Sequence, residues 1–201
     1  MMIVNVLREA GYEEAAMGLS LSFYDHKEEL YDWWTEEKEE RGKYRLTKLA
    51  FKGGGHNKAI ASIQVWLYVQ APRCWWSEFD TYKVGVTANS SSTMHTLSKR
   101  LTNENDYEVG TSPSIIGAFN DCLLDFNNPE HPEYHNITRL KINLPEGWLQ
   151  ERQICCNYMS LQNIIRQRTG HRLKMWDMFI NRLLAQVEHP KLLRQEIEEC
   201  S

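Results

Sequence analysis

The amino-acid sequence predicts an α+β fold, a single domain whose mixed or antiparallel sheet is flanked by helices. Residues 63–70 alternate apolar with polar or aromatic side chains, which is the period of a half-buried strand. The C-terminal part repeats apolar residues at helical spacing, as in Leu173, Trp176, Ile180 and Leu183. With 201 residues, 42% of them hydrophobic, the chain is long enough for one well-buried core.

The N-terminal part is predicted to contribute a short strand at residues 3–6 and a helix at residues 12–23. Residues 24–50 then form a charged insertion that contains Trp33 and Trp34. A charge run of this kind usually marks a solvated helix. Two adjacent Trp residues rarely both face water, so a lid or a subunit contact is the alternative interpretation.

Three consecutive glycines, Gly53 to Gly55, stop the helical stretch that ends at residues 46–51. A glycine run suggests phosphate binding, but the Lys-Ser/Thr of a P-loop is absent here. We therefore interpret the glycines as a helix C-cap.

Pro72 ends the strand at residues 63–70, and a helix is predicted at residues 73–83 from aromatic residues spaced three and four apart. After Gly85, residues 87–93 are seven small residues, six of which offer side-chain hydrogen bonds. We expect this segment to be a loop that receives a polar ligand.

Residues 98–138 are predicted to be a loop-rich excursion around one short helix at residues 116–126. Within it His131 and His135 have the helical i, i+4 spacing of metal ligands. Pro132 disrupts a regular helix between them, so a surface loop without a metal is favoured over a zinc site. A strand is predicted at residues 139–143, then helices at 149–168 and from 171 or 172 to 188.

The net charge of −4 argues against binding to a nucleic-acid polymer but allows a local site for one phosphate. No apolar run approaches the roughly 20 residues of a membrane span, and no signal peptide is recognisable. We therefore expect a cytoplasmic protein without a membrane partner. The five cysteines lack Cys-x-x-Cys spacing and are predicted to be reduced thiols; they are Cys74, Cys122, Cys155, Cys156 and Cys200.

Two ordered motifs carry a family resemblance. Gly55-His56 is followed, sixteen positions after the histidine, by the proline of Ala71-Pro72, and then by the polar segment at residues 82–95. Further on, Leu144-Pro145 precedes a helical stretch with Asn157, Ser160-Leu161, Asn163 and Arg168. Both motifs resemble those of the flavin-dependent thymidylate synthases, the ThyX family. In the ThyX signature that aligns with residues 82–95, the matching positions are Thr87, Asn89 and Ser92.

The resemblance implies a homo-oligomer, most often a tetramer, that transfers a one-carbon unit to the pyrimidine deoxynucleotide dUMP. FAD is the implied cofactor and methylene-tetrahydrofolate the implied co-substrate. Arg168 is the implied catalytic residue, because a guanidinium stabilises negative charge that develops on the pyrimidine ring. The candidate substrate-binding residues are Asn89, Ser92, Lys83, Tyr82 and Lys141. The candidate cofactor-binding residues are His56, Thr87, Asn157 and Asn163.

Each of these assignments has a structural alternative. Asn89 and Ser92 are also ordinary turn residues, and Asn157 and Asn163 suit helix positions where the backbone satisfies an amide. The two asparagines lie six positions apart, so they share a helical face only loosely.

The chain also departs from the family pattern. Where the family has Arg-His-Arg, residues 81–84 supply Lys83 as the one cation, and a single ammonium recognises anions less well than paired guanidinium groups. Three hypotheses remain: a one-carbon transferase, either thymidylate synthase or a hydroxymethylating relative; a non-catalytic nucleotide-binding protein of phage or mobile-element type; and a structural oligomer that keeps only the fold.

Overall fold

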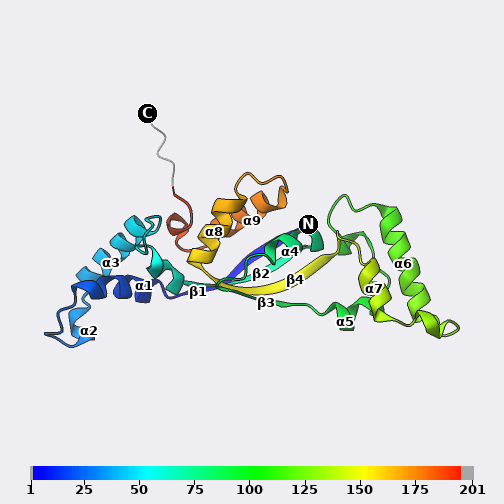
Figure 1. Cartoon of the computed structure of the whole chain (residues 1–201), viewed down its shortest axis with the longest axis horizontal. Coiled ribbons are helices and arrows are strands. Elements are labelled where there is room, and N and C mark those ends of the chain that lie inside the picture. The colour runs from blue at the N-terminus through cyan, green and yellow to red at the C-terminus, as the bar shows by residue number, and fades with distance from the viewer. Residues whose placement is uncertain (1, 196–201) are drawn as a thin grey trace. The chain divides into compact units, whose positions relative to one another are not determined.

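The computed structural model describes residues 2–195, which form four strands and nine α-helices (Figure 1). The strands are β1 (Ile3–Ala10), β2 (Gln64–Pro72), β3 (Val86–Ser90) and β4 (Leu149–Asn157), in the sheet order β1-β2-β4-β3. The helices are α1 (Tyr12–Ser20), α2 (Leu30–Trp33), α3 (Glu36–Leu49), α4 (Arg73–Phe79), α5 (Thr93–Thr96), α6 (Pro113–Asn127), α7 (Ile137–Asn143), α8 (Tyr158–Arg168) and α9 (Met175–Leu184). The predicted α+β class is confirmed.

The chain divides into two compact units. The first contains residues Met1–Val4, Tyr68–Thr81 and Ala88–Gln153, and the second contains Asn5–Leu67, Tyr82–Thr87 and Ile154–Ser201. Each of the four strands has residues in both units. The interpretation of residues 1–201 as a single domain stays a prediction.

Strand β2 confirms the alternation in the sequence. Its side chains at Val65, Leu67 and Val69 have no exposed surface, whereas Trp66 and Tyr68 between them are half-buried. β-branched and aliphatic side chains pack well on a pleated surface, so burial of one face stabilises the strand.

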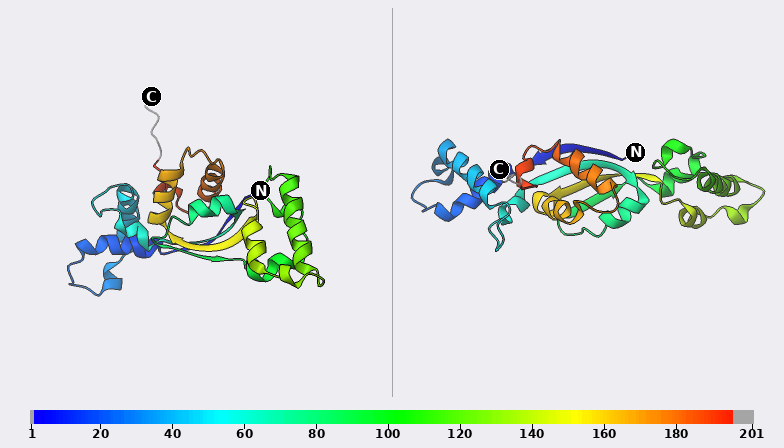
Figure 2. Two further views of the ribbon diagram at one scale, coloured as in Figure 1. Left: turned by 45° about the vertical axis from the view of Figure 1, so that its right-hand side comes forward. Right: turned by 90° about the horizontal axis from the view of Figure 1, so that it is seen from above.

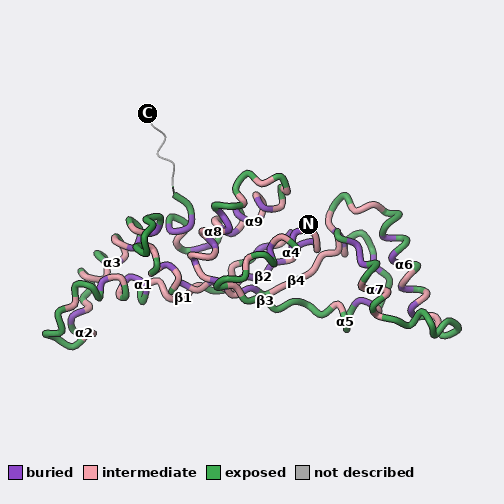
Figure 3. The backbone as a smooth tube through the Cα atoms, viewed as in Figure 1, coloured by how far each residue is buried: buried purple, intermediate pink, exposed green. Residues whose placement is uncertain are grey.

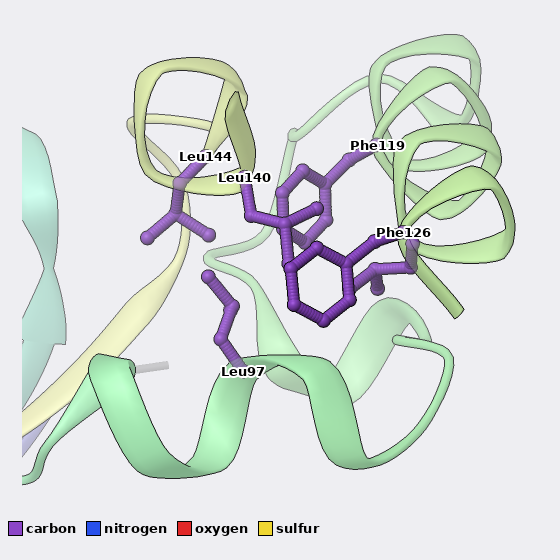
Figure 4. Close-up of a cluster of buried hydrophobic side chains, with 6 residues drawn as sticks. Leu97, Phe119, Phe126, Leu140 and Leu144 are labelled. Atoms are coloured by element: carbon purple, nitrogen blue, oxygen red, sulfur yellow. The ribbon is translucent and has the colours of Figure 1, made fainter. Parts of the chain in front are cut away.

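In the first unit, helices α6 and α7 lie side by side and enclose an apolar cluster (Figures 2 and 4). The buried members of the cluster are Leu97, Phe119, Leu123, Phe126, Leu140 and Leu144. The helix expected at residues 116–126 is therefore confirmed within the longer α6, which begins with proline at its first position.

The strand predicted at residues 139–143 is wrong, because these residues belong to α7. The Asn136 side chain caps the helix by accepting a hydrogen bond from the Thr138 backbone NH at 2.9 Å. Ile137, Leu140 and Leu144 then all face the apolar cluster at the i, i+3, i+7 spacing of one helical face, whereas an extended chain would turn Ile137 and Leu140 to opposite sides. Lys141 consequently lies on a helix rather than a strand.

The single helix predicted at residues 149–168 is also wrong in its first half. Residues 149–157 form β4, which lies between β2 and β3 in the sheet, and only Tyr158–Arg168 are helical. The strand expected to begin at residue 139 is therefore a helix, and strand β4 begins ten residues later, at Leu149. The final helix is shorter than predicted and spans Met175–Leu184.

Other boundaries also shift. Helix α4 ends at Phe79, so Tyr82 and Lys83 follow it in an irregular segment. The loop predicted at residues 87–93 is mostly the edge strand β3. The C-cap of α3 is Ala50, and the glycines instead form the next turn, in which Gly54 and Gly55 have φ values of 73° and 82°.

The charged insertion at residues 24–50 contains α2 and α3. Trp33 is only 7% exposed and packs against Tyr24 and Trp34 within this segment, so the insertion is not a fully solvated helix. Its role as a lid or a subunit contact stays a prediction.

Among residues 2–195, no helix is both long and apolar enough to cross a membrane. The same residues contain no group of three or more side chains arranged to hold a metal ion. His131 Nδ1 lies 3.1 Å from Glu133, and the His135 ring stacks on Phe126. The cysteines at positions 74, 122, 155 and 156 are free thiols, and Cys200 lies outside the described residues.

The second unit is built around α8 and α9, whose inner faces are fully buried (Figure 3). A polar cluster ties the C-terminal segment to β1 and α1. The buried Tyr158 hydroxyl donates to Glu9 and accepts from the His189 backbone NH, and the His189 ring stacks on Tyr12 at 3.5 Å between centroids. Burial lowers the pKa of His189 below its usual value, although Glu9 and Glu188 oppose this effect.

This histidine predicts a pH dependence of stability. Because the folded state lowers the pKa of His189, the unfolded state binds more protons as the pH falls through about 6.5. The contribution of neutral His189 to the free energy of unfolding is therefore complete above about pH 6.5 and is lost as the pH falls below that value. We expect the free energy of unfolding, from urea denaturation between about pH 7.5 and 5, to fall more steeply for the wild-type protein than for His189→Gln. The exposed His56→Gln serves as the control, and parallel curves for wild type and His189→Gln would contradict the prediction.

Candidate functional site

The second unit contains a pocket of about 790 Å³, a size typical of small-molecule sites. Its walls combine apolar side chains with amides, hydroxyls and two guanidinium groups. The lining includes the amides of Asn157 and Asn163, the guanidinium groups of Arg166 and Arg194, and the apolar side chains of Phe51 and Met159.

The pocket is positioned by the start of α8. Asn157 is the last residue of β4 and the N-cap of α8, and its Oδ1 accepts from the Ser160 backbone NH at 2.9 Å. The Ser160 hydroxyl donates to the Val84 carbonyl at 2.8 Å, which fixes the segment after α4 against the helix. Asn157 therefore uses its carbonyl oxygen for the fold.

Gly85 allows the segment after α4 to lie directly against Asn157 and Ser160. Its φ is +67°, and a Cβ added there would lie 2.6 Å from Asn157 Nδ2 and 2.8 Å from Ser160 Oγ. Both the conformation and the space exclude a side chain at this position.

Asn163 follows the same pattern as Asn157. Its Oδ1 accepts from Arg166 Nη2 at 3.1 Å and from Gln167 Nε2 at 3.0 Å. Within residues 2–195, the Nδ2 groups of Asn157 and Asn163 donate to no protein acceptor. Two amide donors in one pocket are therefore available to a ligand.

The cations of the pocket are Arg166 and Arg194, both on its exposed side. Guanidinium groups of this kind suit phosphate or carboxylate. Gln162 supports the wall from behind, because its Nε2 donates to the carbonyls of Ala50 at 2.9 Å and Leu192 at 3.1 Å. Neither arginine was singled out from the sequence, although Arg166 lies inside the motif that contains Asn163.

Arg168 lies at the end of α8 and is held by aromatic groups. Its Nε donates to the Tyr82 hydroxyl at 2.7 Å, and its guanidinium lies 4.7 Å from the Trp176 ring centroid. Its Nη1 is 3.0 Å from His171 Nε2. The predicted pair Arg168 and Tyr82 is thus brought into direct contact, but neither residue lines the pocket of Asn157 and Asn163.

The remaining candidates are distributed over the chain. Lys83, His56 and Thr87 belong to the second unit and are exposed, and the pocket lining does not include them. Asn89, Ser92 and Lys141 belong to the first unit. Asn89 is exposed on β3, Ser92 is the N-cap residue of α5 and Lys141 is in the last turn of α7.

Three comparisons relate the chain to known proteins. No protein-family model matches it, and no curated protein matches its sequence. Solved structures do match its fold. Thymidylate Synthase X from Helicobacter pylori with FAD and dUMP aligns at 14% identity and a TM-score of 0.71, over 96% of this chain and 98% of that chain.

A second structure, the flavin-dependent thymidylate synthase ThyX of Helicobacter pylori complexed with FAD and dUMP, aligns at 15% identity and a TM-score of 0.72. The alignment covers 95% of this chain and 97% of that one. The fold of this chain is therefore that of ThyX structures. This fold agreement confirms the architecture that the two sequence motifs predicted.

The tight packing at Gly85 yields a test of how the pocket is positioned. We expect Gly85→Ala to lower the free energy of unfolding by more than Gly170→Ala. Gly170 has a similar φ of 72° but no atom within 4 Å of an added Cβ, so it reports the backbone cost alone, roughly 1–2 kcal/mol. The excess at Gly85 comes from displacing Asn157 and Ser160, and urea denaturation measures it. Equal losses for the two variants would mean that the contact is relieved without disturbing the cap.

Proposed function

We propose that this chain binds a pyrimidine deoxynucleotide and performs a ThyX-type transfer of a one-carbon unit to dUMP or a related nucleotide. The proposal is supported by a fold that aligns over nearly the full length of two ThyX structures with FAD and dUMP. The observation that carries it is that Asn157 and Asn163, first identified from the family motif, line one pocket with unpartnered amide donors.

The residues of this pocket fit a flavin nucleotide. The Nδ2 groups of Asn157 and Asn163 match the carbonyl and ring-nitrogen acceptors of a flavin, and Arg166 and Arg194 match its phosphates. Apolar side chains such as Met159 and Leu193 suit the faces of an aromatic ring. When bound, a reduced flavin would supply the hydride equivalent of the reaction.

The role we propose for Arg168 is to face the pyrimidine and stabilise negative charge on its carbonyl oxygen. Its contacts with Tyr82 and His171 fix the plane of the guanidinium before substrate arrives, so little conformational entropy is lost on binding. We also propose that Asn89, Ser92, Lys83 and Lys141 contact the nucleotide, and that His56 and Thr87 contact the cofactor.

These substrate and cofactor residues belong to both units of the chain, and we propose that subunits of a homo-oligomer, a tetramer as in the family, complete each site. Methylene-tetrahydrofolate is the proposed one-carbon donor. Light scattering measures the oligomeric state directly.

The second candidate is a non-catalytic nucleotide-binding protein of phage type that senses or sequesters its ligand in the cytoplasm. It is favoured by Lys83, which is the one cation at residues 81–84 and is exposed. A yellow purified protein with flavin absorbance supports the enzyme. A colourless protein whose melting temperature rises with dUMP supports the binding protein, because ligand linkage raises apparent stability. If neither FAD nor any nucleotide changes the melting temperature, the protein is a structural oligomer that keeps only the fold.

Asn163→Asp tests the pocket without removing its internal contacts. The carboxylate still accepts from Arg166 and Gln167, so we expect an unchanged or higher melting temperature. The new oxygen replaces the amide donor and repels the acceptors of a flavin, so FAD affinity should fall by about tenfold or more. Asn181→Asp, exposed on α9, makes the same charge change as a control. Fluorescence titration measures the FAD affinity. Equal affinity for wild type and Asn163→Asp would show that FAD does not bind in this pocket.

Arg168→Lys separates recognition from packing. We expect both Arg168→Ala and Arg168→Lys to lose dUMP binding or turnover, because an ammonium cannot reproduce the planar fork of guanidinium. Arg168→Ala should also lose roughly 1 kcal/mol of stability, since its contacts with Tyr82 and Trp176 disappear. Isothermal titration with dUMP and urea denaturation measure the two effects. If Arg168→Lys keeps normal dUMP affinity, Arg168 is a structural anchor.

A further inference from the structure

A smaller cavity of about 150 Å³ lies in the charged insertion of the second unit and shares no lining residue with the larger pocket. Its walls come from the end of α1, the segment after it, α2 and α3. The lining residues are Ser20, Phe23, Trp33, Lys38, Arg41 and Arg45.

Three cations of α3 line this cavity at positions i, i+3 and i+7, which is the spacing of one helical face. Lys38 Nζ lies 4.7 Å from the Trp33 ring centroid, and the Arg45 guanidinium lies 4.2 Å from the Phe23 ring centroid. Among residues 2–195, neither Lys38 nor Arg45 has a carboxylate within ion-pair distance. The contacts closest to these two charges are therefore ring faces, and Asp25 interacts with Lys38 only over a longer distance.

Arg41 is the third cation, and it pairs with Glu37 one turn earlier. Both side chains of this pair are more than 60% exposed, with 66% and 72% of their surface accessible, so water and salt screen the interaction. An incoming anion can compete for Arg41. Two other acidic residues of α3, Glu39 and Glu40, pair with Lys43 instead.

A buried hydroxyl completes the cavity. Ser20 is only 2% exposed, and its Oγ makes no hydrogen bond among the described residues. Leaving a buried hydroxyl unsatisfied destabilises the fold, so such a group normally has an ion or water as partner. The close approach of α3 at Gly42, where a Cβ would lie 3.0 Å from Ser20 Oγ, keeps the hydroxyl at this position.

We infer that this cavity binds a phosphate group, with Lys38, Arg41 and Arg45 as cationic partners and the Ser20 hydroxyl as a fourth donor. A phosphate dianion balances the net charge of +2 that remains when Glu37 offsets one of the three cations, and its tetrahedral oxygens accept hydrogen bonds from several directions. A planar carboxylate offers one charge and two oxygens, which fits this donor set less well. The inference concerns a separate cavity and does not depend on the proposed function.

Isothermal titration with inorganic phosphate at constant ionic strength tests the inference. We expect one phosphate per chain. Arg45→Gln and Lys38→Gln should each weaken binding by about tenfold, because each removes a charged hydrogen-bond donor. Lys48→Gln serves as the matched control: it removes a charge from the same helix, but Lys48 does not line the cavity. It should leave the affinity unchanged.

Ser20→Ala provides a variant that does not threaten the fold. It removes the unsatisfied hydroxyl, so the melting temperature without phosphate should stay equal or rise, whereas phosphate affinity should fall severalfold. This opposite response of stability and affinity is not expected of a serine that only packs against α3. If Arg45→Gln fails to fold because the contact with Phe23 is lost, Ser20→Ala and Lys38→Gln still decide the test.

Two results would overturn the inference: no saturable binding of phosphate to the wild-type protein, or equal weakening by Lys48→Gln, which indicates diffuse attraction to α3. A parallel titration with dUMP identifies the source of the phosphate group. If dUMP and phosphate compete and Arg45→Gln weakens both, the cavity takes the phosphate of a nucleotide; if they do not compete, it takes free phosphate. Asn163→Asp should leave phosphate binding unchanged, so failure of the proposed function is distinguished from failure of this inference.

Discussion

The second unit depends on the few residues where β4 becomes α8. Asn157 ends the strand and caps the helix, while the next residue, Tyr158, donates its backbone NH to the Ile63 carbonyl at 3.0 Å and its hydroxyl to Glu9. Gly85 allows the chain after α4 to pass against this corner without a side chain. Because strand, helix and preceding loop meet here, a shift of this corner would move together the parts of the pocket wall that Val84, Asn157 and α8 form.

The polar residues of this pocket divide their hydrogen-bonding groups between fold and ligand. Asn157 and Asn163 both use the carbonyl oxygen inside the protein and leave the amide nitrogen without a protein acceptor among the described residues. A side chain held on one side and open on the other is preorganised, so binding costs little ordering. Arg168 is held by Tyr82 and Trp176 in a comparable way, through an aromatic hydroxyl and a ring face.

The charged insertion shows how one helix can serve two environments. On one side of α3, the half-buried Lys43 pairs with the half-buried Glu39 and with the exposed Glu40. On the other side, cations lie over the rings of Trp33 and Phe23 and line a cavity with a buried hydroxyl. The charge density of the sequence was therefore a poor guide to exposure, because aromatic faces compensate some of the charges.

By itself the sequence determined the class of the fold, the central strand β2 and the helix at the centre of α6, because these elements have local patterns with one dominant period. It also placed Asn163 and Arg168 on one helix, whereas Asn157 is the last residue of β4 and the N-cap of that helix. The exchange of strand and helix at residues 139–157 was decided by tertiary structure. Leu140 is helical because its neighbours enclose an apolar cluster, and Ile154 is in a strand because β2 and β3 supply non-local hydrogen bonds. Arg194 and Ser20 likewise acquire their surroundings from segments distant in sequence, so no local pattern could reveal them.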